Sequence, residues 1–237
     1  MAAKFPVRAL GTAREVRALP GFVFALGILV IAGSVFAADL GRDRDHDYDA
    51  PVPGTYALPV VKPAAGGPLI DSAGKSVDLR DLTHGRITVL SFIYTRCADG
   101  RACPYASNVL GQLQLASAKD KTLGDNMRLV SLSFDPADTP QRMAEYGDAM
   151  RETNTGSEWR FVAAKSPSDL ESILKAYGQA IDKRANPADP LGPLYHVLRV
   201  FLIDSQGRVR NIYSSGTLDP RLVLADVKTL LLEEAKN

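Results

Sequence analysis

The chain has 237 residues and an ordinary globular composition, with 46% hydrophobic, 23% charged and 7% aromatic residues. Its formal net charge is +1, and because the first 38 residues hold four basic side chains and one acidic one, the remainder is slightly acidic. No basic stripe or cluster stands out in that remainder, which excludes nucleic acid as an expected partner.

An uncharged, apolar stretch from Ala18 to Ala38 predicts a membrane anchor within residues 1–38. About 20 apolar residues are enough to cross a bilayer core as a helix. The basic flank lies before the stretch and an acidic segment after it, so we expect a cytoplasmic N-terminus and an exported remainder. Val35 to Ala37 offers small residues for signal peptidase, but the leading arm is long for a signal peptide. We therefore expect an uncleaved, single-pass anchor in the inner (cytoplasmic) membrane, with the C-terminal domain in the periplasm or an equivalent exported compartment.

Residues 39–67 predict a flexible linker, because this acidic and Pro/Gly/Ala-rich segment has little apolar surface to bury. His46 lies among its aspartates, and a solvated acidic spacer is a better interpretation of so short a tract than a metal site.

Residues 68–237 alternate strand and helix patterns. Two short strands are expected over 69–79, and an almost continuously apolar strand, typical of burial on both faces, over 87–94. Further strands are expected over 127–134 and 159–163, a hairpin over 198–213, and helices from Pro104, Thr139, Ser166 and Asp219. This order predicts an α/β domain with a mixed central sheet flanked by helices, which is the arrangement of the thioredoxin-like fold.

Cys97 and Cys103 are the only two cysteines, and they lie in the loop between the 87–94 strand and the following helix. The short polar loop predicts sulfurs near solvent, and the helix start should lower the pKa of Cys103, with Arg96 and Arg101 adding positive charge. The pair could hold a metal ion, form a redox-active disulfide, or form a static one. A static disulfide across so small a loop would stabilise the domain by only about 2 kcal/mol. In an exported domain the thiols stay reduced only with a metal or a dedicated reductant.

Three separated segments resemble, in the same order, the Sco/SenC family of membrane-tethered, thioredoxin-fold copper proteins. They are residues 91–104, 133–140 and 196–207, and the resemblance extends over about residues 60–235. Members of this family help to assemble the copper A centre of cytochrome c oxidase. The resemblance implies copper, as Cu(I), Cu(II) or both, with Cys97, Cys103 and His196 as ligands and Asp135 nearby. Two soft thiolates select Cu(I), and an added imidazole also accommodates Cu(II).

The implied partner is an exported or membrane cuproprotein, such as a cytochrome c oxidase subunit. The sequence departs from the family motif in having five residues between the cysteines instead of three. We expect Gly100 to let this longer loop fold back.

Three other functions fit the cysteine pair less well, and a metallochaperone is favoured over an enzyme that turns over substrate. A thiol–disulfide oxidoreductase could keep the cysteines of an exported metalloprotein reduced. However, the spacing is not Cys-x-x-Cys, and Tyr195 precedes His196 where such reductases usually have a proline. A peroxidase using Cys97 and a binding module with a structural disulfide are the remaining alternatives.

Overall fold

The longest apolar run of the folded domain forms the centre of its sheet. The computed structural model describes residues 48–151 and 155–236. Within them, β4 (Ile87–Ile93) is buried at every position and pairs in parallel with β5 (Met127–Ser133). β5 pairs in parallel with β6 (Glu158–Ala164). A strand covered on both faces needs apolar side chains on both, which explains the continuous pattern of β4.

Antiparallel strands extend this parallel centre on both sides, so the predicted mixed sheet is confirmed. The order of its eight strands is β1-β10-β9-β4-β5-β6-β2-β3. The predicted C-terminal hairpin places β9 directly beside β4, and the predicted N-terminal pair of short strands lies beside β6. The added strands are β1 (Lys62–Pro63), β2 (Pro68–Asp71), β3 (Ser76–Asp78), β9 (Val200–Ile203) and β10 (Arg208–Tyr213).

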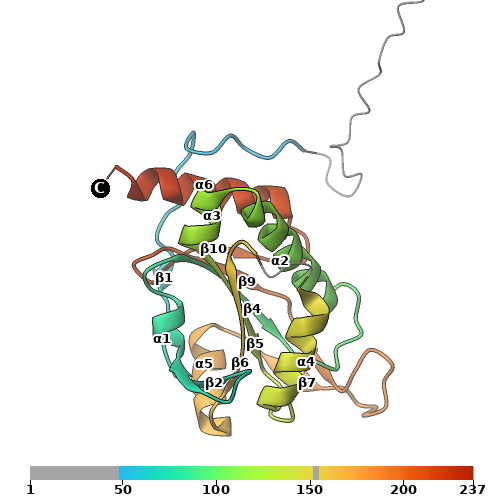
Figure 1. Cartoon of the computed structure of the whole chain (residues 1–237). Coiled ribbons are helices and arrows are strands. Elements are labelled where there is room, and N and C mark those ends of the chain that lie inside the picture. The colour runs from blue at the N-terminus through green and yellow to red at the C-terminus, as the bar shows by residue number, and fades with distance from the viewer. Residues whose placement is uncertain (1–47, 152–154, 237) are drawn as a thin grey trace, which may run out of the picture. The chain divides into compact units, whose positions relative to one another are not determined.

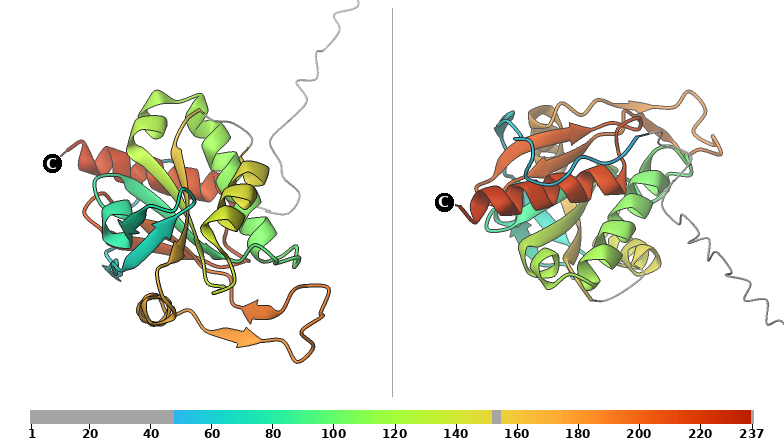
Figure 2. Two further views of the ribbon diagram at one scale, coloured as in Figure 1. Left: turned by 60° about the horizontal axis from the view of Figure 1, so that its bottom comes forward. Right: turned by 90° about the horizontal axis from the view of Figure 1, so that it is seen from above.

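Helices cover both faces of the sheet (Figure 1). α2 (Cys103–Ala118), α4 (Pro140–Met150) and α6 (Pro220–Glu234) lie on one face, and α5 (Pro167–Ala176) lies on the other (Figure 2). The expected N-caps are present, since the side chains of Thr139, Ser166 and Asp219 each accept a hydrogen bond from the first turn of their helix. Their local sequence therefore sets where α4, α5 and α6 begin.

Besides β1, four short elements were not expected. They are α1 (Leu79–Leu82), α3 (Lys121–Asn126), β7 (Ile181–Lys183) and β8 (Leu194–His196). The helix expected from Ser166 forms α5, which ends at Ala176, and Gly178 then takes a φ of +64°, which ends helices readily. The chain then forms the separate antiparallel hairpin β7–β8, which projects from the body of the domain in Figure 2.

The second half of the expected flexible linker is packed against the domain. Tyr56 donates a hydrogen bond to Asp226 at 2.6 Å, and β1 pairs with β10. Leu58 is buried, and its carbonyl oxygen accepts a hydrogen bond from Arg210 Nε at 2.9 Å. The few apolar residues of this segment are thus enough to fix it. The predicted anchor and His46 lie outside the described residues, and no helix within those residues is long and apolar enough to span a membrane.

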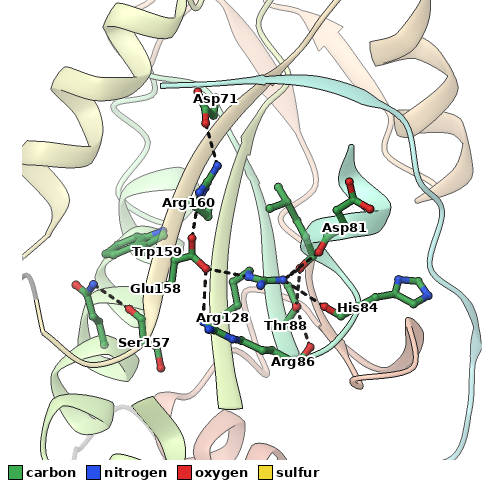
Figure 3. Close-up of polar contacts among 12 residues, drawn as sticks. Asp71, Asp81, His84, Arg86, Thr88, Arg128, Ser157, Glu158, Trp159 and Arg160 are labelled. Carbon is green, nitrogen blue, oxygen red and sulfur yellow. Dashed lines mark hydrogen bonds and ion pairs between the residues drawn. The ribbon is translucent and has the colours of Figure 1, made fainter. Parts of the chain in front are cut away.

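Figure 3 shows a network of charged side chains around the starts of β5 and β6. β4 runs parallel to these strands and ends at the cysteine loop, so the network lies at the opposite end of the sheet. Glu158 accepts hydrogen bonds from Arg128 and Arg160, and Arg160 reaches Asp71 at 2.9 Å. Arg128 also donates to the Leu82 carbonyl at 2.8 Å. These contacts tie β5, β6 and β2 to the end of α1, so they stabilise the scaffold and not the cysteine loop.

Candidate metal centre

The two cysteines lie at the end of β4 where the chain turns into α2. The Cys97 N–H donates to the Tyr94 carbonyl at 3.2 Å, and the Ala102 N–H donates to the Asp99 carbonyl at 2.9 Å. Two successive turns therefore fold the longer loop back on itself. Cys103 is the first residue of α2 and is fully buried, whereas Cys97 is partly exposed. The expectation that both sulfurs lie near solvent is wrong for Cys103, because its side chain packs into the core.

Gly100 does not supply the freedom expected of it. It is absent from the glycines with positive φ, and a Cβ placed there would meet open space. The loop instead closes through the hydrogen bonds of its backbone.

His196 lies against Cys103 although 93 residues separate them in sequence. Its Nε2 atom is 3.5 Å from Cys103 Sγ, and its ring packs on Phe134 with the centroids 4.5 Å apart. Only 7% of the residue is exposed, and Nδ1 has no hydrogen-bond partner within residues 48–151 and 155–236. Burial lowers the pKa of His196 to about 4, so the imidazole is neutral at physiological pH, the form that binds metal ions.

The two thiols interact and differ in acidity. A hydrogen bond from Cys103 is the main cause that lowers the pKa of Cys97 to about 6, and backbone N–H groups of Cys103 and Asp99 add to it. Burial, followed by the neighbouring Cys97 thiolate, raises the pKa of Cys103. The sequence-based expectation of a thiolate at Cys103 is therefore wrong, because burial outweighs the helix start. The reactive thiolate is Cys97.

This difference predicts that alkylation distinguishes the two thiols. Iodoacetamide should modify Cys97 at a rate that rises through about pH 6 and then levels off, while Cys103 reacts only after unfolding. Replacing Cys103 with alanine removes the main cause of the shift and should move the Cys97 midpoint to higher pH. Mass spectrometry of the labelled peptides measures both rates. A Cys97 rate that rises only above about pH 8, as for an unperturbed thiol, would contradict this assignment.

Two buried aspartates from the segment after β5 hold the cysteine loop. Asp135 accepts a hydrogen bond from Arg96 at 2.6 Å, so it contacts the loop through Arg96. The sequence predicts that Arg96 adds positive charge beside the thiols. In the structure that charge is paired with the Asp135 carboxylate, so Arg96 places no unpaired positive charge there. Asp138, which sequence reasoning did not single out, accepts hydrogen bonds from the Thr95 N–H at 2.9 Å, the Thr95 hydroxyl at 2.5 Å and the Ser133 hydroxyl at 2.6 Å. Its only sequence signal was its place in the 133–140 segment.

The loop of the β7–β8 hairpin contacts the cysteine loop directly. This contact brings His196, at the end of β8, close to cysteines that are distant in sequence. The Ala98 N–H donates to the Leu191 carbonyl at 3.2 Å, and Arg184 forms an ion pair with Asp99 at 3.7 Å. Gly192 has a φ of +101°, and a Cβ there would lie 2.3 Å from the Tyr94 hydroxyl oxygen. Only glycine allows so close an approach.

The donor set suits a soft metal ion, although the ligands are not assembled around one position. Within residues 48–151 and 155–236, no three His, Cys, Asp or Glu side chains form a complete metal-binding group. The structure instead contains two pairs, Cys97 with Cys103 and Cys103 with His196, that share Cys103. Two thiols and a neutral imidazole whose Nε2 atom faces Cys103 are donors that suit a thiophilic ion, once the side chains rearrange around it. The same thiols could also form a disulfide.

Comparison with known proteins gives one family. The family model SCO1/SenC matches residues 66–232. A SCO1/SenC family lipoprotein from Bacillus anthracis superposes with a TM-score of 0.59 at 26% identity, covering 72% of this chain and 95% of that one. ScoI of Arabidopsis thaliana with copper bound gives a TM-score of 0.58 at 21% identity, covering 71% and 98%. Yeast Sco1 with copper bound superposes with a TM-score of 0.55 at 17% identity, and the match covers 74% of this chain and 95% of that one. No curated protein sequence matches the chain.

Proposed function

The chain belongs to the SCO1/SenC family, and on that premise we propose that it binds copper and delivers it to a cuproprotein under assembly. The observation that carries the proposal is the contact between Cys103 and His196, with the Cys97 thiolate joined to the same cysteine. These three side chains come from two segments that nothing but the fold brings together. Copper is the cargo here, and the solved Sco structures with copper bound support this choice of metal.

Each side chain has a separate part in the proposed binding. Cys97 is the ready ligand, because it is already a thiolate near neutral pH and is partly exposed. Cys103 must lose its proton on binding, so uptake of copper should release protons. His196 is held neutral by burial and has its Nε2 atom beside Cys103. Buried His196 and Cys103 keep water from one side of the site, while Cys97 faces the side from which copper enters and leaves.

The finer proposal concerns the target and the membrane. We propose the copper A centre of cytochrome c oxidase as the acceptor, and residues 1–38 as an anchor that keeps residues 68–237 on the exported side of the membrane. The support is the family itself together with the apolar stretch and charge asymmetry of the N-terminal sequence. A metal carrier tethered in the same membrane as its client raises the local concentration of both.

A titration with Cu(I) tests the proposal. The reduced protein, titrated anaerobically against a chromophoric Cu(I) chelator, should take up one tight equivalent. Cys97→Ala and Cys103→Ala should each lose tight binding, because one thiolate alone cannot retain Cu(I) against the chelator. His84→Ala is the matched control, since His84 lies outside the site with its Nδ1 2.9 Å from the Arg80 carbonyl. No tight equivalent in the wild-type protein would refute copper binding.

A thiol–disulfide oxidoreductase is the second candidate, favoured by one observation. A low-pKa, partly exposed Cys97 beside a buried, protonated Cys103 is the asymmetry of an attacking and a resolving thiol. Such an enzyme would exchange rapidly with a small disulfide substrate and would not depend on His196. If exchange is fast and unaffected by His196→Ala while copper binding is absent, this second function replaces the first.

A further inference from the structure

Tyr94 is the residue through which the cysteine loop contacts the histidine strand. It directly follows β4 and precedes Cys97 by three residues, and it is 1% exposed. Its hydroxyl donates a hydrogen bond shared between the carbonyl oxygens of Leu194, at 3.0 Å, and Leu191, at 3.3 Å. Leu194 begins β8, the strand that ends with His196. One side chain therefore joins the two segments that carry the candidate ligands.

The ring of Tyr94 also reaches His196 through Phe134. The Tyr94 and Phe134 centroids are 5.1 Å apart, and those of Phe134 and His196 are 4.5 Å apart. Tilted aromatic pairs at such distances attract each other and restrict the rings. Among the residues that the structure describes, none forms a hydrogen bond with His196 Nδ1, so packing contributes much of what holds that side of the ring. Its orientation depends on this packing and on the position of β8.

The hydroxyl of Tyr94 has a separate effect from its ring. The Leu191 carbonyl also accepts a hydrogen bond from the Ala98 N–H at 3.2 Å, but the Leu194 carbonyl depends on Tyr94 for its contact with the cysteine loop. Removing only the hydroxyl would leave the Tyr94–Phe134–His196 packing in place. It would also leave a carbonyl two residues from His196 without its partner on the cysteine loop.

We propose that Tyr94 is a positioning residue whose hydroxyl sets the place of His196 relative to the two cysteines, and thereby favours binding of Cu(II) over Cu(I). This inference rests on the proposed copper function. Two thiolates suffice for Cu(I), whereas Cu(II) needs the imidazole nitrogen. The Tyr94 hydroxyl also interacts with the Cys97 thiol, and the loss of that contact should weaken the Cu(I) and Cu(II) forms alike. The effect that passes through the position of His196 adds to the loss in the Cu(II) form alone.

Tyr94→Phe in the full chain tests the inference. We expect the variant to bind Cu(II) about 10-fold more weakly, in the range seen when a group that orients a ligand is removed. Its Cu(I) affinity should fall by a clearly smaller factor, because only the contact with Cys97 matters there, and its Cu(II) electron paramagnetic resonance spectrum should become heterogeneous. Equal losses in the two oxidation states would overturn the inference, because the hydroxyl would then act through Cys97 and not through His196. In the metal-free protein, hydrogen exchange at the Ala98 amide and in β7–β8 should accelerate. Tyr177→Phe is the matched control, because Tyr177 is equally buried and also donates to a backbone carbonyl, that of Ala65 at 3.0 Å, outside the site.

The outcomes separate this inference from the function on which it rests. If the wild-type protein binds copper in neither oxidation state, the proposed function fails and this role of Tyr94 fails with it. If the wild type binds Cu(II) and Tyr94→Phe retains its affinity and spectrum, only the inference about Tyr94 is overturned. An equal loss in Tyr177→Phe would also overturn it, because the effect would then come from general loosening of the domain.

Discussion

Replacing His196 with alanine is expected to lower the affinity for Cu(II) by at least about 100-fold, because the variant retains only thiolate ligands. Cu(I) affinity should fall far less, since the Cys97–Cys103 pair is left in place. Competition titrations with chelators specific for each oxidation state measure both constants. The variant thereby separates the role of the imidazole from that of the thiols.

His196→Gln provides the control for packing. It retains a polar side chain that can fill part of the space beside Phe134 but lacks the imidazole nitrogen. It should lose Cu(II) binding as alanine does. Cu(II) affinity that is unchanged in both variants would remove His196 from the ligand set.

Replacing Asp138 with alanine is expected to lower the free energy of unfolding by about 3 kcal/mol. The change leaves three donors without their acceptor, the Thr95 N–H and the Thr95 and Ser133 hydroxyls, at a position 5% exposed. Each buried group left unsatisfied costs roughly 1–3 kcal/mol. Urea denaturation followed by circular dichroism measures the loss.

The effect of Asp138 should extend to the metal centre, because Thr95 lies two residues before Cys97. We expect Asp138→Ala to weaken Cu(I) binding as well as stability. Asp148→Ala is the matched control. Its side chain is 81% exposed and forms an ion pair with Arg151, an exposed contact of little energy, so the change should alter neither quantity appreciably. A loss of stability below about 1 kcal/mol in Asp138→Ala would show that the loop does not depend on this carboxylate.

Much of the scaffold could be predicted because local patterns determine it. The apolar run of β4 required burial on both faces, and the capping side chains of Thr139, Ser166 and Asp219 set the starts of three helices. The β7–β8 hairpin could not be predicted in this way. Its strands are three residues each and are fixed by contacts with the cysteine loop, which no local pattern records.

The candidate site shows the same division between local and long-range causes. The spacing of Cys97 and Cys103 and the motif at His196 were visible in the sequence. The sequence did not show which cysteine is the thiolate, because the answer depends on how deeply the folded domain buries Cys103. The acceptor role of Asp138 and the contact of Tyr94 with β8 likewise arise only when separate segments meet.

The X-ray absorption spectrum of the copper-loaded protein at the copper edge tests the central claim most directly. The claim is that Cys97, Cys103 and His196 converge on one copper ion. In the Cu(II) form, the account predicts two sulfur scatterers and an imidazole nitrogen in the wild-type protein. It predicts one sulfur fewer in Cys97→Ala or Cys103→Ala, and loss of the imidazole signal in His196→Ala. A wild-type spectrum with fewer than two sulfur scatterers, or an imidazole signal that persists in His196→Ala, would contradict it.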